Sequence, residues 1–261
     1  MDLKKYEYFK TEYGTLYNGD CLDLLPYIKP VDLTITSPPY NMQVKYNHIK
    51  KRYERRHERK EFSKKYEYFY DCVLPIKKYY SFHRKVLSLL INLSNTVFWN
   101  VQLVSGNKEA VFKIFGHFCK NIKEVIFWDK MISEPAMFPG VINKQGEIIT
   151  VFEKEGRGRK LNYHKFNKGT LSDTWKIKAD RQNKKIRACF PKELIVKILS
   201  NWKAQTVLDP FSGSGQTGAV CEYYKINWIA IEKAEKACEI AKRNIFLSSR
   251  KRKSTLTRRT I

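Results

Sequence analysis

Acidic residues are scarce in this sequence, and its cysteines are not arranged in pairs. The 261 residues include 26 Asp and Glu against 50 Lys and Arg, which gives a formal net charge of +24. An excess of that size favours a polyanionic partner, most commonly nucleic acid, over positive charge carried for solubility alone. None of the six cysteines stands in a C-x-x-C pair. The sequence therefore predicts neither a zinc site nor a redox pair, and no other metal centre.

Long apolar runs are missing as well. No stretch comes close to the roughly eighteen apolar residues that a membrane span requires. The first ten residues carry charges throughout and lack the apolar core of a signal peptide. Together with scattered cysteines, which are typical of reduced thiols, these absences predict a cytoplasmic protein without membrane contact. Hydrophobic residues still make up 43% of the chain, enough for one large α/β domain with a small insertion.

Strands and helices are predicted to alternate along most of the chain. The β-branched run 31–36 predicts a buried strand, which must stop at the two prolines that follow it. The clearest unit is strand 206–209, helix 217–224, strand 228–232 and helix 234–246, an order that implies parallel strands with right-handed crossovers. Elsewhere the patterns predict strands 15–17, 96–101 and 125–128, helices 21–28, 79–93 and 191–202, and a hairpin of 140–143 with 147–152 at a sheet edge.

A glycine-rich loop, D-P-F-S-G-S-G-Q-T at 209–217, joins a predicted strand to a helix. Glycines permit positive φ and let a ligand approach the backbone closely, and nucleotides bind at this end of parallel strands in open α/β sheets. Glu232 lies nineteen residues beyond Gly213, placed to accept hydrogen bonds from both ribose hydroxyls. Because neither G-x-G-x-x-G nor G-K-S/T is present, an adenosyl cofactor without a pyrophosphate fits best. An ordinary tight turn followed by a strand-end acid is the alternative.

The strand 31–36 ends in a proline turn, S-P-P-Y at 37–40. The hydroxyl of Ser37 and the carbonyl of Pro38 are two acceptors, and the fixed φ of proline aims the carbonyl rigidly. An aromatic amine held by both would be drawn toward tetrahedral geometry, which frees its nitrogen lone pair for methylation. Tyr40 can stack on a base swung out of a duplex. A proline-rich turn without a chemical role is the alternative.

Together, the two motifs resemble those of the amino-methyltransferases of DNA, the N4-cytosine and N6-adenine enzymes of bacterial restriction–modification type. The turn at 37–40 matches that family's catalytic D/N/S-P-P-Y/F, and 209–215 matches its cofactor motif, with Gln216 where Thr is usual. The segment 187–194 resembles the family's H-P-A-x-F-P but lacks the His-Pro, so only its Phe and the following Pro carry over. The resemblance spans residues 12–246.

The resemblance implies S-adenosylmethionine as cofactor and a Rossmann-like fold with a seven-stranded, mostly parallel sheet covered by helices on both faces. Because the catalytic turn precedes the glycine loop, the order is that of the circularly permuted beta group. The implied catalytic residues are Ser37, Pro38, Pro39 and Tyr40. The implied cofactor-binding residues are Asp20, Ser37, Phe190, Asp209, Phe211, Gly213, Ser214, Gly215 and Glu232.

In that group the target-recognition region lies between the two motifs. We therefore expect a catalytic half over 1–153 with a basic flap at about 41–70, a target-recognition region over 154–187, a cofactor-binding half over 188–247 and a basic tail over 248–261. The recognition region contains twelve Lys and Arg against three acids, a composition suited to neutralising phosphates. The candidates for DNA contact are Arg157, Arg159 and Lys160 there, and Lys50, Lys51 and Arg52 in the flap.

The resulting hypothesis is a site-specific DNA methyltransferase that acts on the exocyclic amine of a flipped-out base. Ser37 is typical of the N4-cytosine enzymes, and Asp at that position of most N6-adenine enzymes, so cytosine is favoured and adenine stays open. Methylation at cytosine C5 is not expected, because it needs a nucleophilic cysteine after proline and no Pro-Cys occurs.

Two alternatives remain, namely an enzyme acting on RNA or on a protein glutamine, and a DNA-binding protein on an inactive methyltransferase scaffold. The intact proline turn and the acid at Glu232 argue against an inactive scaffold. The expected partner is double-stranded DNA. The resemblance leaves open a cognate restriction endonuclease and a homodimer.

Overall fold

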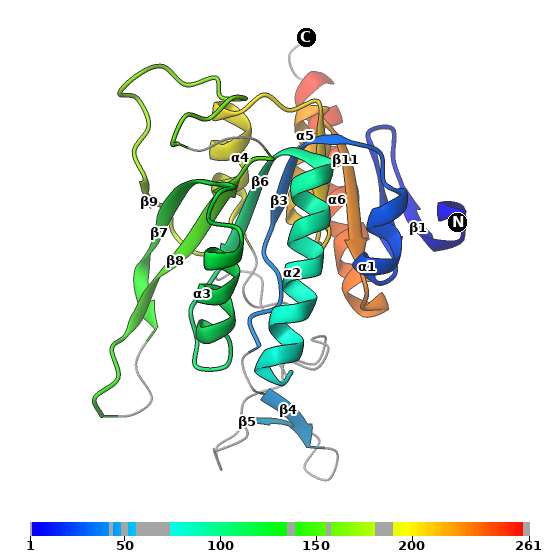
Figure 1. The fold of residues 1–261 in the computed structure, drawn as a ribbon. Coiled ribbons are helices and arrows are strands. Elements are labelled where there is room, and N and C mark those ends of the chain that lie inside the picture. The colour runs from blue at the N-terminus through cyan, green and yellow to red at the C-terminus, as the bar shows by residue number, and fades with distance from the viewer. Residues whose placement is uncertain are drawn as a thin grey trace.

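The computed structural model describes residues 2–41, 44–47, 52–55, 74–134, 139–154, 158–180 and 190–257. Their main feature is one mixed sheet of nine strands (Figure 1). Five of its eight neighbouring pairs are parallel and three are antiparallel. From one edge to the other the strands are β1 (Glu7–Lys10), β2 (Gly14–Asn18), β11 (Asn227–Glu232), β10 (Thr206–Asp209), β3 (Val31–Thr36), β6 (Ser94–Val101), β8 (Lys144–Phe152), β7 (Ile122–Glu134) and β9 (Thr174–Lys176).

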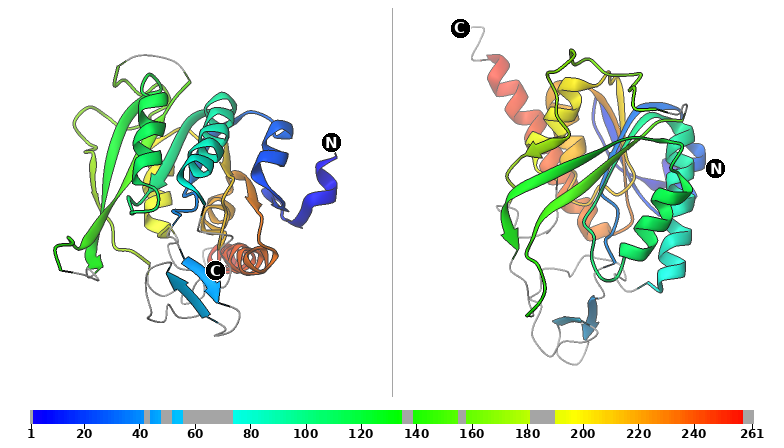
Figure 2. Two further views of the ribbon diagram at one scale, coloured as in Figure 1. Left: turned by 60° about the horizontal axis from the view of Figure 1, so that its bottom comes forward. Right: turned by 60° about the vertical axis from the view of Figure 1, so that its left-hand side comes forward.

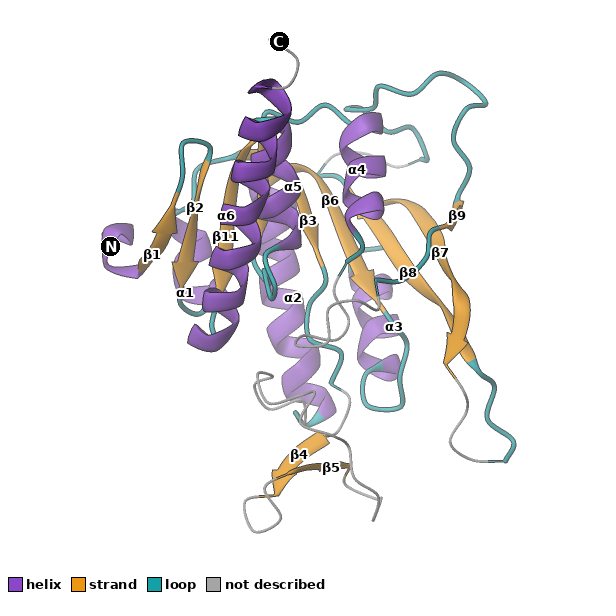
Figure 3. Ribbon diagram, turned by 180° about the vertical axis from the view of Figure 1, so that it is seen from behind, coloured by secondary structure: helices purple, strands orange, loops and turns teal. Residues whose placement is uncertain are grey.

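Helices cover both faces of this sheet. One face carries α1 (Cys21–Leu24), α2 (Ile76–Leu93) and α3 (Lys108–His117), and the other carries α4 (Lys192–Asn201), α5 (Gln216–Tyr224) and α6 (Glu235–Thr257) (Figures 1 and 3). The short 3-10 helices are η1 (Leu3–Tyr6) and η2 (Leu25–Tyr27), and a separate antiparallel pair, β4 (Val44–Asn47) and β5 (Arg52–Arg55), lies outside the main sheet (Figure 2). Of the helices in the described ranges, none combines the length and apolar character needed to cross a membrane.

Central strands are buried on both sides, as β6 shows. Val97 and Trp99 pack into the layer of α2 and α3. Phe98 points to the other side, where its ring meets that of Trp202 edge-on with centroids 4.8 Å apart. All four side chains are at most 1% exposed, and each contributes about 1.5–3 kcal/mol of transfer free energy. Two-sided burial therefore explains why three apolar residues follow one another in the middle of this strand.

Two expectations about the sheet are wrong. The sheet has nine strands, because β1 adds to β2 at one edge and the three-residue β9 adds to β7 at the other. The segment 140–143 is not a strand, and its Val141 and Ile142 are 54% and 85% exposed. β8 pairs with β7 and β6 instead, so it lies inside the sheet. Its Ile149 and Val151 are fully buried, as expected for a strand that has β6 on one side and β7 on the other.

Helix boundaries also differ at two places from the sequence patterns. The predicted helix 21–28 gives way after Leu24 to the 3-10 turn η2, in which Pro26 occupies the first turn. The last helix, α6, continues to Thr257. It therefore extends well beyond the predicted end at residue 246, into the segment expected to be a basic tail.

Candidate active site

The two sequence motifs lie at the carboxyl ends of neighbouring parallel strands. β3 ends at Thr36, just before the proline turn, and β10 ends at Asp209, just before the glycine loop. The next helix after β3 is α2 on one face, whereas α5 follows β10 on the other face (Figures 1 and 3). Such a switch point is where open α/β sheets bind their ligands. The hydroxyl of Thr36 donates to Oδ1 of Asp209 over 2.9 Å and ties the two strand ends together.

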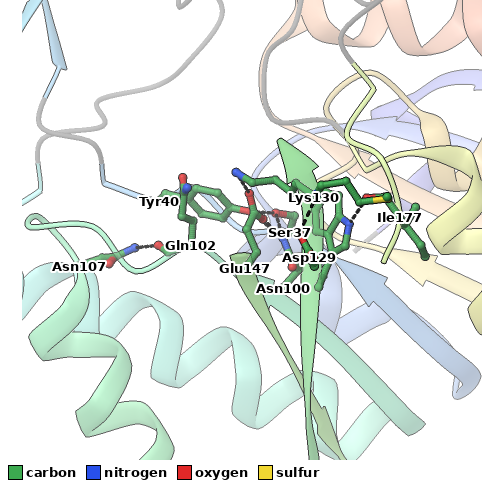
Figure 4. Close-up of polar contacts among 11 residues, drawn as sticks. Ser37, Tyr40, Asn100, Gln102, Asn107, Asp129, Lys130, Glu147 and Ile177 are labelled. Carbon is green, nitrogen blue, oxygen red and sulfur yellow. Dashed lines mark hydrogen bonds and ion pairs between the residues drawn. The ribbon is translucent and has the colours of Figure 1, made fainter. Parts of the chain in front are cut away.

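Tyr40 of the proline turn is buried and lies within a polar network. Its hydroxyl is 2.7 Å from Oγ of Ser37 and donates to Oε2 of Glu147 over 2.8 Å (Figure 4). Nδ2 of Asn100, on β6, donates to the Tyr40 hydroxyl and to Glu147, at 2.6 Å each. Burial, and then the negative charge of Glu147, raise the pKa of Tyr40 well above its ordinary value of 10. The hydroxyl therefore stays protonated at neutral pH, and the stacking role of the ring stays a prediction.

Glu147 and Lys130 form a buried ion pair beside this network. Nζ of Lys130 lies 3.3 Å from Oε1 of Glu147, and the two residues are 4% and 7% exposed. Lys130 follows Trp128 by two positions on β7, and the period of a strand turns both to the buried face, whereas Phe127 is 53% exposed. Neither Lys130 nor Glu147 was predicted as a site residue from the sequence. The spacing from Trp128 is a signal for Lys130. Glu147 stands opposite Trp128 in the pairing of β7 with β8, and that pairing brings its carboxylate within 3.3 Å of Lys130.

The proline turn is held in place from both sides. The hydroxyl of Tyr79, on α2, donates to the carbonyl of Pro39 over 2.8 Å. Asn41 has a positive φ of 53°, and its amide donates to the carbonyls of Leu74 (3.0 Å) and Gly106 (2.7 Å). These contacts fasten the turn to α2 and to the loop before α3.

The glycine loop adopts backbone conformations that favour glycine. Gly213 and Gly215 have φ of +51° and +74°. A Cβ at Gly215 would lie 2.8 Å from Cα and Cβ of Ala241 on α6, so a larger residue clashes there. Ser214, between the two glycines, is 2% exposed. The buried hydroxyl of Ser212 has no hydrogen-bond partner among the described residues. The loop therefore brings bare backbone and an unpaired polar group to the switch point.

The carboxylate of Asp209 is hydrogen-bonded to both ends of the glycine loop. It is 4% exposed and accepts hydrogen bonds from the hydroxyls of Thr36 (2.9 Å) and Thr217 (2.8 Å) and from the amide of Phe211 (3.2 Å). Burial raises the pKa of this carboxyl to about 6, although all three hydrogen bonds act in the opposite direction. Asp209 thus links β3, β10 and α5, and its direct contact with a cofactor stays a prediction.

Two further acids lie at the same edge of the sheet. Glu232 ends β11, and its carboxylate accepts from the amides of Gly213 (2.8 Å) and Ala234 (2.9 Å). Burial raises its pKa. Asp20 follows β2, caps the start of α1 and pairs with Lys233 at 2.9 Å. Because β2, β11 and β10 are adjacent, the structure brings both acids to the edge that carries the glycine loop.

The two phenylalanines predicted to bind the cofactor lie in different parts of the structure. Phe211 lies at the switch point, with its ring centroid 6.1 Å from that of Phe82 and 6.3 Å from that of His83, both on α2. Phe190 is 7% exposed and packs against Trp128 of β7, with centroids 6.4 Å apart. Phe190 therefore belongs to the core on the α4 side, and its contact with a cofactor is untested.

The basic candidates Arg159 and Lys160 lie at the other end of the sheet from the proline turn. β8 ends where Phe152 pairs with Val97, near the start of β6, and His164 bridges to Trp202 shortly before β10 begins. The segment 158–171 is therefore at the amino ends of the parallel strands, at the top of Figure 1. From β9 onward the described part of the tract runs parallel to β7 toward the carboxyl ends of the parallel strands, where the amide of Ile177 donates to the carbonyl of Asp129 over 3.0 Å.

The structure describes only some of the basic side chains predicted to contact DNA. Arg159 forms a surface ion pair with Glu124 at 2.5 Å and is 81% exposed, and Lys160 is also exposed. Arg157, Lys50 and Lys51 lie outside the described residues. So does the side chain of Arg52, whose backbone belongs to β5. Their contacts with DNA stay predictions.

The arrangement as a whole suits transfer to an amine. It combines a hydroxyl and a rigid carbonyl at one strand end with a bare backbone loop at the next, and a protonated tyrosine joins the hydroxyl to a carboxylate. Within the described ranges, no group of three His, Cys, Asp or Glu could hold a metal ion.

Known proteins are similar to this chain in sequence and in fold. Type II methyltransferase M.BamHI of Bacillus amyloliquefaciens is 28% identical over 91% of this chain and 58% of its own length. Type II methyltransferase M2.MboI of Moraxella bovis is 24% identical over 93% of this chain and 91% of its own. The chain thus spans little more than half of the first relative and nearly all of the second.

Two solved structures establish the fold. PvuII DNA methyltransferase, described as cytosine-N4-specific, matches with a TM-score of 0.63 at 16% identity, over 94% of this chain and 97% of that one. The M1.HpyAVI–SAM complex matches with a TM-score of 0.58 at 17% identity, over 89% and 98%. The Rossmann-like methyltransferase fold expected from the motifs is therefore confirmed. Residues 31–243 match the N6_N4_Mtase family, described as DNA methylase, and because this match covers most of the chain, the protein belongs to that family.

Proposed function

We propose that this protein is an S-adenosylmethionine-dependent methyltransferase acting on the exocyclic amine of a DNA base. The observation that carries the proposal is the meeting of the two motifs at one switch point, where Thr36 and Asp209 join the strand ends directly. The type II methyltransferases among the relatives support it. The net charge of +24 supports double-stranded DNA as the partner.

The residues of the glycine loop fit an adenosyl cofactor. Gly213 and Gly215 let a ligand reach the backbone, and the unpaired hydroxyl of Ser212 calls for a polar partner. Each carboxylate oxygen of Glu232 accepts one amide and retains a lone pair for a ribose hydroxyl. When bound, S-adenosylmethionine supplies a methyl group activated on a sulfonium. The solved M1.HpyAVI–SAM complex, which shares the fold, supports this choice.

The proline turn would hold the target amine. The Ser37 hydroxyl and the Pro38 carbonyl would accept hydrogen bonds from its two N–H groups, so that the nitrogen lone pair is released from the ring. The turn keeps its position because Tyr79 anchors the Pro39 carbonyl. The buried Tyr40, bonded to Ser37, keeps the hydroxyl in a defined orientation. Reaching this buried turn requires the base to leave the duplex.

Cytosine N4 is the proposed target, with adenine N6 as the alternative. Ser37 in the first position of the turn supports cytosine, as that residue is typical of N4-cytosine enzymes. The cytosine-N4-specific PvuII enzyme has the highest TM-score among the structures compared above and supports the same choice.

The test supplies purified protein with S-adenosylmethionine carrying a labelled methyl group and mixed-sequence double-stranded DNA, and identifies the labelled nucleoside by mass spectrometry. N4-methylcytosine is the expected product. Labelled N6-methyladenine would replace cytosine by adenine, and label found only in RNA or protein would overturn the proposal. Cofactor binding measured by calorimetry, with no transfer to any acceptor, would instead indicate a DNA-binding protein on an inactive scaffold.

Two proposed partners follow from the family resemblance. A cognate restriction endonuclease would cut unmethylated DNA at the same recognition sequence, so DNA treated with this protein and cofactor should resist such a nuclease. A homodimer is checked by sedimentation of the protein alone and with DNA.

A further inference from the structure

Two hydroxyls and one carboxylate form a directed chain at the catalytic end of the sheet. The hydroxyl of Tyr40 donates to Oε2 of Glu147 over 2.8 Å. A hydroxyl has only one proton, so the 2.7 Å contact between Ser37 and Tyr40 must use the proton of Ser37. Both protons therefore point toward Glu147, which leaves Oγ of Ser37 as an acceptor for a group that approaches it. Figure 4 shows the contacts that join Ser37, Tyr40 and Glu147.

The surrounding side chains keep this direction. Nδ2 of Asn100 donates to Glu147 and to Tyr40 at 2.6 Å each and lies 3.4 Å from Oγ of Ser37. An amide nitrogen accepts no hydrogen bond, so Asn100 cannot reverse the chain. The ammonium of Lys130, 3.3 Å from Oε1, balances the charge of Glu147.

Stability alone does not account for this buried ion pair. Replacing such a pair by apolar residues is often neutral or stabilising, because both charges have to leave water. Lys130 lies next to an irregularity in the pairing of β7 with β8, where Met131 takes a φ of +60°. Irregularities of this kind recur beside active sites, where they re-aim a side chain. Three polar side chains contact Glu147 directly, namely Tyr40, Asn100 and Lys130, and Ser37 is joined to it through Tyr40.

We propose that Glu147, paired with Lys130, is a positioning residue that makes Ser37 an obligate acceptor for the target amine and receives the proton which that amine loses. The inference rests on the proposed function and assigns it a proton path. The amine nitrogen forms its bond to the methyl carbon while the carbon–sulfur bond breaks and leaves its electron pair on sulfur. The nitrogen then gives one proton to Ser37, Ser37 gives its own to Tyr40, and Tyr40 gives its own to Glu147. Each hydroxyl keeps one proton, and Glu147 becomes neutral until the proton passes to solvent.

The central variant is Glu147→Gln, which keeps the shape and removes the charge. A glutamine amide donates as well as accepts, so the direction of the chain is lost. The control is Glu109→Gln, in the surface pair of Glu109 with Lys113. Because Glu147→Gln removes the negative charge that faces the buried ammonium of Lys130, the double variant Lys130→Met/Glu147→Gln is made as well. Unfolding midpoints, and the Kd of the cofactor by calorimetry, show that each variant is folded.

We expect the single-turnover rate on DNA to fall about 10²–10³-fold in Glu147→Gln and in the double variant with Lys130→Met, within the roughly 10²–10⁴-fold that positioned proton transfer contributes. The Kd values for cofactor and DNA should stay within about twofold, because no binding contact is removed. Tyr40→Phe should lose a similar factor, and Tyr40→Phe/Glu147→Gln no more than either alone, since links of one chain act as a unit. Glu147→Asp should recover part of the rate. Wild type should also show a solvent deuterium isotope effect that Glu147→Gln lacks.

A rate within about threefold of wild type in folded Glu147→Gln would overturn the inference. So would losses that add in full in Tyr40→Phe/Glu147→Gln, because the two side chains would then act independently. Failure of the proposed function would look different, since wild type itself would bind cofactor and transfer nothing to DNA.

Discussion

Replacement of Gly215 by alanine tests what holds the glycine loop against α6. Gly215 directly precedes α5 and has a φ of +74°, and a Cβ there would lie 2.8 Å from Cα and Cβ of Ala241. Two independent costs therefore act at one position: a left-handed backbone for an L residue, and a contact with the backbone of a packed helix. Gly169 separates them, since its φ is +79° and a Cβ there would meet nothing within 4 Å.

The magnitudes follow from these two costs. A left-handed conformation costs an L residue roughly 1–2 kcal/mol, and forcing an extra methyl group into a packed core costs about 1–3 kcal/mol. Gly215→Ala should therefore lower the free energy of unfolding by about 2–5 kcal/mol. Gly169→Ala should lower it by only about 1–2 kcal/mol.

Urea unfolding followed by circular dichroism measures both variants. Ala241→Gly alone should cost about 1 kcal/mol as a helix glycine. In the Gly215→Ala background the same change removes the contact, so the double variant should be more stable than Gly215→Ala. Calorimetry should show weaker cofactor binding in Gly215→Ala and none of that loss in Gly169→Ala. Equal destabilisation by Gly215→Ala and Gly169→Ala would refute the reasoning.

Three further predictions concern the same end of the sheet. Burial lowers the pKa of His83 to about 3. Between pH 3 and pH 6.5 the unfolded state therefore binds more protons than the folded state, and the free energy of unfolding falls with falling pH by up to about 1.4 kcal/mol per pH unit. His83→Phe should lose this pH dependence, as measured by urea unfolding at pH 5 and 7. Thr36→Val removes the 2.9 Å bond to Asp209 and should cost about 1–3 kcal/mol; unchanged stability and cofactor Kd would mean that the strand ends are held by other contacts. Tyr40→Ala should abolish methyl transfer while the cofactor Kd measured by calorimetry stays unchanged, and equal loss of both would place Tyr40 in the cofactor pocket.

Much of the site follows from short stretches of sequence. The strand 31–36 must stop at two prolines, because proline fixes its own φ and has no N–H for a ladder. The loop 209–217 contains two glycines, because glycine adopts positive φ at little cost. The alternation of strands and helices from 206 onward implies parallel strands, and parallel strands bring Glu232 to the edge that carries the loop. These features depend on neighbours in the chain, which a local pattern records.

Other features depend on residues far apart in the sequence. The pairing of β7 with β8 replaced the expected hairpin, and with it came the contact between Lys130 and Glu147. The placement of 158–171 at the amino ends of the strands likewise follows from the antiparallel course of β8. Strand partners are chosen by the burial of side chains on both faces of the sheet, and a local pattern shows that a side chain is apolar without showing what covers it. The two motifs and their place at neighbouring strand ends could therefore be predicted from the chain, whereas the contacts of Glu147 with Tyr40 and Lys130 were decided only by the tertiary packing of distant strands.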